Sequence, residues 1–474
     1  MTEAPLWSGL DLVARLNARV RGSLSMRVTG ISIDTRTLQP GDLFFAIKGE
    51  AQDGHDHVET ALERGAAAAV VDEAHADAFG LVGPLYIVHD TLQAMEHLGS
   101  AARERMGGRV IAVTGSVGKT STKEALRTVL AEAGPTHASA ASYNNHWGVP
   151  LTLARMPDAT RFGVFEIGMN HAGEITPLVA MVRPHIAIVT TVAPVHLEFF
   201  SGVEAIADAK AEIFSGLEPG GLAIINRDDN TYDQMRAHAE ASPARHVLSF
   251  GAHPEANARL DTLTQVSDAS LVRATILGQP VNFHLGAPGR HMAMNALAVL
   301  LAAKASGLDL AAAAASLGRV SAAEGRGARS RIDTGRGAFT LIDESYNANP
   351  TSMRAALHLL AAAMPGPGGR RIAVLGDMRE MGPQAPEMHR DLADAVEASD
   401  ADLVFAAGPL MRELVQVLPE AHRGAYAETA DGLRADLFSI LRPGDVVMVK
   451  GSKASRMTPL VQAMKAHFSP SATA

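Results

Sequence analysis

The sequence predicts an α/β fold of three domains, with a mostly parallel sheet in the central domain, a small α/β domain before it and a Rossmann-like domain after it. Two observations favour this fold. The chain has 474 residues, more than one ordinary hydrophobic core accommodates. Apolar runs of strand length alternate with helical segments, which is typical of parallel sheets with crossover helices. Glycine-containing breaks place the expected domains at residues 1–107, 108–330 and 331–474.

The composition excludes several classes of protein. Lysine and arginine total 42 against 51 aspartate and glutamate residues, and the net charge of −9 argues against a nucleic-acid partner. The chain contains no cysteine, so disulfides and cysteine-based metal sites are excluded. The first residues lack the pattern of a secretory signal. The most apolar expected helix, 295–317, contains Lys304 and Asp309, so we expect no membrane insertion and a cytoplasmic location.

The N-terminal domain carries a short polar strand ahead of a helix expected at 58–64. The alternate spacing of Ser32, Asp34 and Arg36 predicts that their side chains lie on one face of that strand. Such a face could bind a ligand. A solvated sheet edge is the alternative, with equal weight.

A strand expected at 110–113 opens the central domain and leads into a glycine turn, which a helix expected at 124–130 follows. Backbone N–H groups at such a turn bind phosphate, a lysine adds a mobile cation, and a threonine can hold Mg²⁺. Only two residues separate the glycines instead of the usual four, and a chance match in an ordinary loop is the alternative. The residues expected to contact a nucleotide are Gly115, Ser116, Val117, Gly118, Lys119, Thr120 and Ser121.

Polar residues also follow the next expected strands, at 163–167, 186–192 and 222–225. Ligands of open parallel sheets bind beyond the carboxyl ends of the strands, so these residues are expected to converge. Glu166 within an apolar strand is costly unless it is paired or binds a metal. Glu166 and His196 are therefore candidates for magnesium coordination beside Thr120. For His196, a hydrogen bond to a backbone carbonyl is the alternative.

Lys210 has an unexpected position in the helix predicted at 203–217. It lies four residues after Ile206 and three before Ile213, in the middle of the apolar face. A bare ammonium group would be costly there. The side chain could snorkel to water, pair with an anion, or be chemically modified.

Further polar segments occur around the last domain. Asn295 lies early in the helix expected at 295–317, and Arg326 in a glycine-rich segment suits phosphate or simply solvent. Strands are expected at 339–342, 371–375, 403–406 and 446–449, and no Gly-x-Gly-x-x-Gly motif follows them, which disfavours a dinucleotide. Polar residues follow the first and last of these strands: Asp343, Glu344, Tyr346, Asn347 and Asn349, then Lys450, Ser452 and Lys453. From Phe468 onward we expect a disordered tail.

Taken together, these residues resemble the Mur ligase family over nearly the whole chain. The resemblance is carried by several motifs in the family's order, and the shortened phosphate loop is the family's own variant. These motifs are Thr114-Gly-Ser-Val-Gly-Lys-Thr120, Asn144-Asn-His-Trp-Gly-Val-Pro-Leu-Thr-Leu153, Glu166-Ile-Gly-Met-Asn170, Asp343-Glu-Ser-Tyr-Asn-Ala-Asn-Pro350, Leu375-Gly-Asp-Met378 and Lys450-Gly-Ser452.

The resemblance implies a cytoplasmic ligase that uses ATP and Mg²⁺ to join D-Ala-D-Ala to UDP-MurNAc-tripeptide through an acyl phosphate. It implies magnesium ligands at Thr120, Glu166 and His196, and a carbamylated lysine at Lys210. The catalytic residues that the resemblance implies are Lys119, Glu166, His196 and Lys210. The positions that match the family's nucleotide contacts are Asn295, Arg326, Asp343 and Glu344. Substrate contacts are expected at Ser32, Asp34, Arg36, Phe45, Asn144, Asn145, Tyr346, Asn347, Asn349, Lys450 and Ser452. Ser142 replaces an asparagine common in the family.

Two rival functions stay open. One is a related ligase that adds a single amino acid, either another Mur ligase or a folylpolyglutamate synthase. The Asp-Asn-Pro-Arg signature of a diaminopimelate-adding ligase is absent from the sequence. The other is a nucleotide-binding protein without ligase activity, which would leave Glu166, His196, Lys210 and the last domain unexplained. We expect a monomer.

Overall fold

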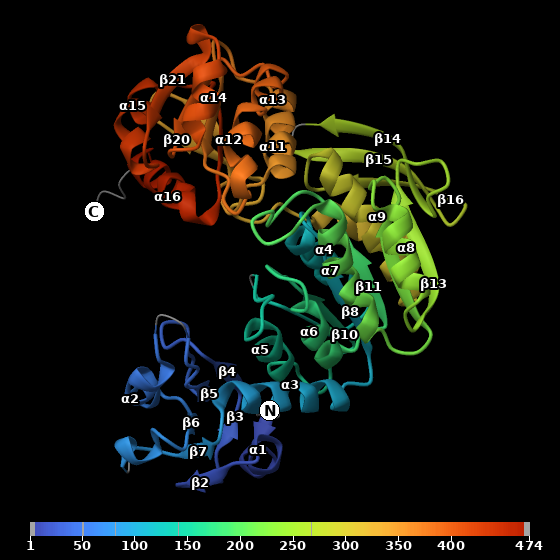
Figure 1. Cartoon of the computed structure of the whole chain (residues 1–474), viewed down its shortest axis with the longest axis vertical. Helices are drawn as coiled ribbons and strands as arrows, with labels where there is room; N and C mark the ends of the chain where they lie inside the picture. Colours follow the sequence, from blue (N-terminus) through green and yellow to red (C-terminus); the bar gives the residue numbers. More distant parts are fainter. Residues whose placement is uncertain (1–4, 50–51, 81, 141, 267, 469–474) are drawn as a thin grey trace.

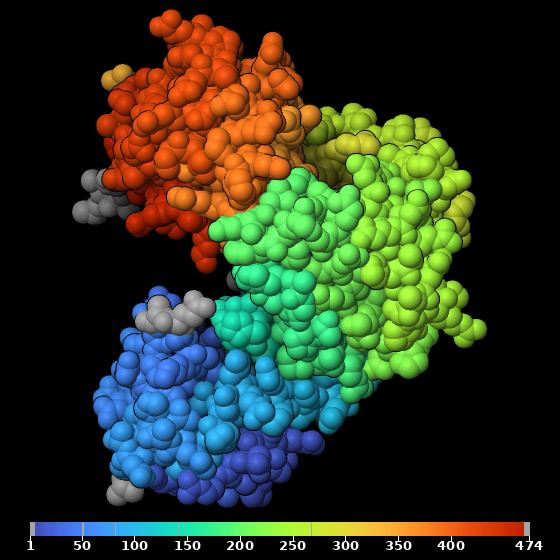
Figure 2. All heavy atoms as spheres, in the orientation of Figure 1, coloured from blue at the N-terminus to red at the C-terminus, as the bar shows by residue number. Residues whose placement is uncertain are grey.

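The computed structural model describes residues 5–49, 52–80, 82–140, 142–266 and 268–468. Figure 1 shows an N-terminal unit at one end of the molecule, a C-terminal unit at the other and a central unit joining them. Figure 2 shows a hollow between the two end units, closed on one side by the central unit. In the described ranges, no helix has the length and apolar character needed to cross a membrane. The expected α/β class is confirmed.

The N-terminal unit contains a five-stranded sheet in the order β2-β7-β6-β5-β4 and a separate pair, β1 and β3. Strands β4 to β7 are parallel and β2 is antiparallel to β7. Its elements are β1 (Trp7–Ser8), α1 (Gly9–Leu16), β2 (Arg19–Arg21), β3 (Arg27–Val28), β4 (Gly30–Ser32), β5 (Asp42–Phe45), α2 (Val58–Glu63), β6 (Ala68–Asp72), β7 (Leu85–Val88) and α3 (Thr91–Arg105).

The central unit is built on a nine-stranded sheet in the order β16-β15-β14-β13-β12-β11-β8-β10-β9. Its first strands and helices are β8 (Arg109–Thr114), α4 (Lys119–Ala131), β9 (Thr136–Ala138), α5 (Gly148–Ala154), β10 (Phe162–Glu166), α6 (Ile175–Val182), β11 (Ile186–Val189) and α7 (Val203–Ala211). The remainder are β12 (Gly221–Asn226), α8 (Tyr232–Glu240), β13 (Ala244–Gly251), β14 (Ala258–Val266), β15 (Ala269–Ile276), β16 (Gln279–Leu285), α9 (Arg290–Ala305) and α10 (Leu310–Ser316). The antiparallel strands β14 to β16 extend the parallel part, and no sequence motif indicated them.

The C-terminal unit has a six-stranded sheet in the order β17-β18-β22-β19-β20-β21, parallel except for β17. Its elements are β17 (Ala328–Asp333), β18 (Ala338–Glu344), α11 (Pro350–Ala362), β19 (Arg371–Gly376), α12 (Ala385–Arg390), α13 (Ala393–Glu397), β20 (Leu403–Ala407), α14 (Met411–Val417), β21 (Arg423–Ala427), α15 (Arg434–Ile440), β22 (Val446–Lys450) and α16 (Met457–Phe468). Phe468 ends α16 and packs on Phe339, so the expectation of disorder is wrong at this residue. The rest of the expected tail, 469–474, lies outside the described residues.

One hydrophobic cluster continues from the N-terminal unit into the central unit. Trp7 and Leu98 belong to it together with Val149 of α5. The Trp7 indole N–H donates to the carbonyl of Ala154 at 2.9 Å, and the Arg105 guanidinium stacks over the indole ring. The C-terminal unit has its own clusters on the two faces of its sheet. The first two units therefore pack as one body, and the third has a separate core.

The expectation that Ser32, Asp34 and Arg36 share a strand face is wrong. Strand β4 ends at Ser32, and the following residues form a turn. The Asp34 carboxylate accepts a hydrogen bond from the Arg36 backbone N–H at 2.9 Å and also pairs with the Arg36 guanidinium. An aspartate that bonds the backbone two residues on favours a turn over a strand.

Several expected element boundaries also differ. The helix expected at 295–317 is two helices, α9 and α10, because Gly307 adopts φ +89° and Asp309 caps α10 by accepting from Ala312 N. The helix expected at 203–217 ends as α7 at Ala211, and a 3₁₀ turn continues to Gly216. Strand β11 ends at Val189 rather than 192. Helix α4 starts at Lys119, five residues before the expected start.

Candidate functional site

The glycine turn between β8 and α4 is shaped by its neighbours. Gly115 has φ +146°, and a Cβ atom there would lie 2.0 Å from Thr190 Oγ1. Gly118 has φ +93°, and a Cβ atom there would lie 2.7 Å from Asn295 Nδ2. Both positions therefore favour glycine. Helix α4 starts directly after this turn without a side-chain cap, so its first N–H groups, which have no partner within the helix, can bind an anion. The loop has the geometry of a phosphate cradle.

Lys119 is the first residue of α4. Its ammonium group donates to the carbonyl oxygen of Gly115 at 2.6 Å, which holds the side chain over the loop. Burial lowers the pKa of Lys119, and Glu166 opposes that shift. The Lys119 ammonium group is thus held next to the place where phosphate oxygens would bind.

A buried carboxylate stands beside this lysine at the end of β10. Glu166 is 1% exposed. It accepts hydrogen bonds from Thr120 Oγ1 at 2.8 Å and from Asn144 Nδ2 at 2.7 Å. Thr120 Oγ1 is also 3.4 Å from Ser142 Oγ, to which Arg326 donates at 3.2 Å. Carboxylate and hydroxyl oxygens gathered in this way suit a hard divalent cation.

His196 lies on the loop after β11 with φ +55°. Its Nδ1 is 2.5 Å from Oε2 of Glu380, a residue of the C-terminal unit. The hydrogen bond from His196 lowers the pKa of Glu380. The histidine therefore connects the central unit to the C-terminal unit at the edge of the site.

Lys210 lies in the apolar face, as its spacing predicted, but only 2% of its surface is exposed, so its side chain does not snorkel to water. Burial, and secondarily the charge of Lys119, lowers its pKa well below the ordinary lysine value. Among the described residues, only burial and the Lys119 charge act on its amine, with no hydrogen bond among the causes of its pKa shift. The lowered pKa favours the neutral form of the amine, which is the form that reacts with electrophiles.

A cavity of about 580 Å³ brings residues of two units together. The predicted residues that line it are Ser116, Val117, Gly118, Lys119, Ser121, Asn144, Asn145, Glu166, His196, Arg326, Glu344, Tyr346, Asn347, Asn349 and Lys450. Ser452 lines a second cavity, of about 530 Å³, which shares Lys119, His196 and Tyr346 with the first.

Hydrogen bonds and a ring contact fix the side chains that the C-terminal unit contributes to the cavity. Lys450 Nζ donates to Glu344 at 3.3 Å and to the carbonyl of Asn347 at 3.0 Å, and burial lowers the pKa of this lysine. The Arg326 guanidinium lies 4.3 Å from the centre of the Tyr346 ring. Arg326 thereby contacts residues of both units.

Other predicted residues do not line these cavities. Gly115 of the phosphate loop, Thr120 of α4 and Asn295 of α9 are buried. Asp343 accepts hydrogen bonds from Gly325 N and Ser345 Oγ, so it fixes the segment that joins the two units. Lys210 is buried on α7.

The predicted residues of the N-terminal unit lie outside both cavities. Ser32 and Phe45 are buried, Phe45 completely. Only the Arg36 side chain is largely exposed, at 86%. Their predicted contact with a substrate stays a prediction.

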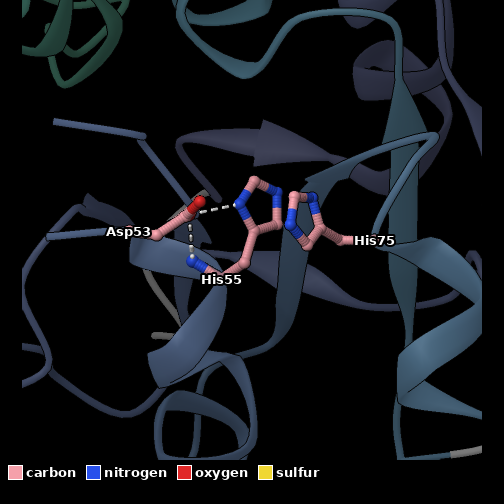
Figure 3. A group of neighbouring side chains, drawn as sticks. All are labelled: Asp53, His55 and His75. Carbon is pink, nitrogen blue, oxygen red and sulfur yellow. Dashed lines mark hydrogen bonds and ion pairs between the residues drawn. The ribbon is translucent and has the colours of Figure 1, made fainter.

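A second cluster of polar side chains lies in the N-terminal unit (Figure 3). His55 Nδ1 bonds Asp53 Oδ1 at 2.6 Å, and His55 Nε2 accepts from the backbone N–H of Asp72 at 3.1 Å. The His75 ring stacks on the His55 ring with 4.1 Å between centroids. Both ring nitrogens of His55 are used in these hydrogen bonds, and Asp53 also caps the 3₁₀ turn that starts at Gly54, so His55 and Asp53 hold local structure.

The cavity also has lining residues that the sequence did not single out as contacts, among them Tyr143, Trp147, His291 and Ser352. Trp147 belongs to the Asn144–Leu153 motif, which was a signal for its position at the site. His291 precedes Asn295 on α9 by about one helical turn, which is a weaker signal. Nothing in the sequence around Ser352 indicated its position.

The fold and the cavity define a phosphate-loop nucleotide-binding enzyme whose site is completed by a C-terminal Rossmann-like unit. Family models match three successive parts of the chain: the Mur ligase family catalytic domain at 27–105, the Mur ligase middle domain at 113–303 and the Mur ligase glutamate ligase domain at 325–453. The chain belongs to the Mur ligase family.

Similar proteins cover almost the full chain. The UDP-N-acetylmuramoyl-tripeptide--D-alanyl-D-alanine ligase of Escherichia coli is 35% identical over 95% of this chain and 96% of its own length. The ligase of the same name from Bacillus subtilis is 31% identical over 92% and 93%. The crystal structure of MurF from Acinetobacter baumannii has a TM-score of 0.83 at 28% identity and covers 97% of this chain and 99% of its own.

Proposed function

We propose that this chain is an ATP-dependent ligase that joins D-alanyl-D-alanine to UDP-N-acetylmuramoyl-tripeptide in peptidoglycan precursor synthesis. The observation that carries the proposal is the similarity to ligases of this activity over almost the whole chain. The cavity supports it, because the phosphate loop faces polar residues of the C-terminal unit across a space large enough for several groups.

The reaction needs activation of a carboxylate, which is a poor acyl donor. The tripeptide's terminal carboxylate attacks the γ-phosphorus of ATP, and ADP leaves. The amine of D-Ala-D-Ala then attacks the acyl phosphate carbon, and phosphate leaves as the amine loses its proton. Lys119 and the N–H groups of the phosphate loop neutralise the charge of the transferred phosphoryl group, while the units hold the reactants in line.

The buried oxygens around Glu166 support magnesium binding. We propose that Glu166, Thr120 and His196 hold Mg²⁺, directly or through water. The carboxylate is buried and receives hydrogen bonds from two neutral donors, so a cation would complete its charge balance. Bound there, Mg²⁺ would neutralise phosphate charge.

Lys210 supports a further modification. We propose that its amine is carbamylated: the nitrogen lone pair bonds to the carbon of CO₂, and the amine loses a proton. The pKa lowered by burial favours the unprotonated amine, which is the form that reacts with CO₂. The product is an anion that interacts with the charge of Lys119, so a neutral amine is replaced by a group that can serve a metal.

We propose the following roles for the three parts of the chain. Residues 1–107 bind the UDP-sugar peptide, 108–330 bind ATP, and 331–474 bind the incoming dipeptide, with the whole acting as a cytoplasmic monomer. The nucleotide contacts are Arg326, Asn295 and Glu344 beside the phosphate loop, with Asp343 supporting the linker. The residues that bind the dipeptide lie on the C-terminal side of the cavities: Tyr346, Asn347, Asn349, Lys450 and Ser452.

The fold alone does not separate this activity from those of related ligases. A folylpolyglutamate synthase from Mycobacterium tuberculosis has the same fold, with a TM-score of 0.61 at 16% identity, and covers 78% of this chain. Its lower coverage and identity make it a weaker guide than the D-alanyl-D-alanine ligases. A non-ligating nucleotide-binding protein would leave the Glu166 network and Lys210 without a role.

Hydroxylamine trapping tests the acyl phosphate. With ATP and UDP-MurNAc-tripeptide but no dipeptide, hydroxylamine should convert the activated carboxylate to a hydroxamate, detected by mass spectrometry. Omitting ATP should abolish the product. If hydroxamate forms without ATP, or ATP is consumed and no hydroxamate appears, the proposed intermediate is wrong.

A further inference from the structure

Asp229 follows β12 and is half-buried outside both cavities, next to the loop that follows β11. Its Oδ1 accepts hydrogen bonds from Thr191 Oγ1 at 2.8 Å and Asn226 Nδ2 at 3.2 Å. Its Oδ2 accepts from the backbone N–H of Val192 at 2.8 Å. Both carboxylate oxygens are therefore used to fix one short segment, residues 190–193.

The same segment holds the phosphate loop. Ser116 N donates to the carbonyl of Thr191 at 2.8 Å, and Ala193 N donates to Ser116 Oγ at 2.9 Å. Thr190 Oγ1 donates to the carbonyl of Val117 at 2.6 Å. Because the turn has only two residues between its glycines, these contacts fix most of its length.

We propose that Asp229 is a positioning residue for the nucleotide: it holds residues 190–193, which in turn hold Ser116 and Val117 in the conformation that binds phosphate. The inference rests on the proposed function of the loop as an ATP site. Asp229 touches neither the cavity nor a proposed metal ligand, so it acts only through this chain of hydrogen bonds.

The energetics support a requirement for a carboxylate. Burial raises the pKa of Asp229 to about 6, with neighbouring Asp228 adding to the shift and the hydrogen bonds opposing it. An ionised group is therefore kept in an unfavourable environment at neutral pH. Asparagine would avoid this cost, but one of its two ends is an NH₂ group, which would face an N–H donor on at least one side.

The test compares two adjacent aspartates. Asp229→Asn should raise the KM for ATP, and the Kd for a non-hydrolysable ATP analogue with Mg²⁺, by about tenfold, the effect of roughly one lost hydrogen bond. The kcat and the KM for UDP-MurNAc-tripeptide should stay within about twofold. The control is Asp228→Asn: Asp228 accepts from Ala252 N and His253 N, away from the phosphate loop, and its loss should leave the ATP constants unchanged.

A second variant keeps the test decisive if Asp229→Asn does not fold. Thr191→Val removes one donor with little change of shape and should raise the same constants about threefold. Where both variants fold, the double variant should have the same Kd and KM for the nucleotide as Asp229→Asn alone, because both substitutions break the same connection between Asp229 and residues 190–193. The inference is overturned if the Kd for the ATP analogue is unchanged in Asp229→Asn or in Thr191→Val. It is also overturned if Asp228→Asn raises this Kd as much as Asp229→Asn does, or if the two increases multiply in the double variant. Analogue binding does not require turnover, so a failure of ligation would be separately visible.

Discussion

Lys210→Ala is expected to lower kcat by about a hundredfold or more while leaving the protein folded. The reason is chemical: the variant removes the nitrogen that would carry the carbamate, and with it an anion worth several kcal/mol at the metal site. Folding should survive, because the wild-type amine is buried and no hydrogen bond is among the causes of its pKa shift in the described ranges. Steady-state kinetics and a thermal melt measure the two effects separately.

Chemical rescue distinguishes the carbamate from other roles of Lys210. A short carboxylate such as formate or acetate should enter the space left by the side chain and restore part of the activity of Lys210→Ala. The matched control, Lys304→Ala, removes an exposed lysine of α9 and should behave like wild type. A ¹³C signal of the carbamate should appear with labelled bicarbonate. Near wild-type activity in Lys210→Ala would refute the carbamate.

Glu166→Gln is expected to have the next largest effect. The amide keeps the size of the side chain but removes the buried charge that would balance Mg²⁺. We expect the Mg²⁺ concentration for half-maximal activity to rise at least about tenfold and kcat to fall about a hundredfold. A magnesium titration of activity at saturating ATP measures both changes.

The control for this variant is Glu240→Gln, which removes an exposed carboxylate paired with Arg236 on α8. Exposed pairs of this kind contribute little, so activity and the magnesium dependence should not change. If Glu166→Gln lowers kcat without shifting the magnesium dependence, Glu166 does not act as a metal ligand.

The local pattern of the sequence predicted much of the central unit. Apolar runs located β8, β10 and β12 to within a residue or so, because buried parallel strands need continuous apolar side chains. The rule that ligands bind beyond strand ends correctly grouped the phosphate loop with Glu166 and His196 around one cavity. The burial of Lys210 also followed from helical periodicity.

Features that depend on long-range contacts were less predictable. Asp34 satisfies the backbone of its own turn, and this local bond overrides the alternating pattern that suggested a strand. Gly307 and Asp309 divide a long apolar segment into two helices. The contact between His196 and Glu380 joins residues 184 positions apart, and no local motif indicates such a pairing.

The most direct test of the account is ADP release by the full chain with ATP, Mg²⁺ and UDP-MurNAc-tripeptide, measured with and without D-Ala-D-Ala. We predict sustained release only when the dipeptide is present, with one ADP formed for each ligated product. Turnover that does not need the dipeptide, or that proceeds faster with a single amino acid, would contradict the proposed function.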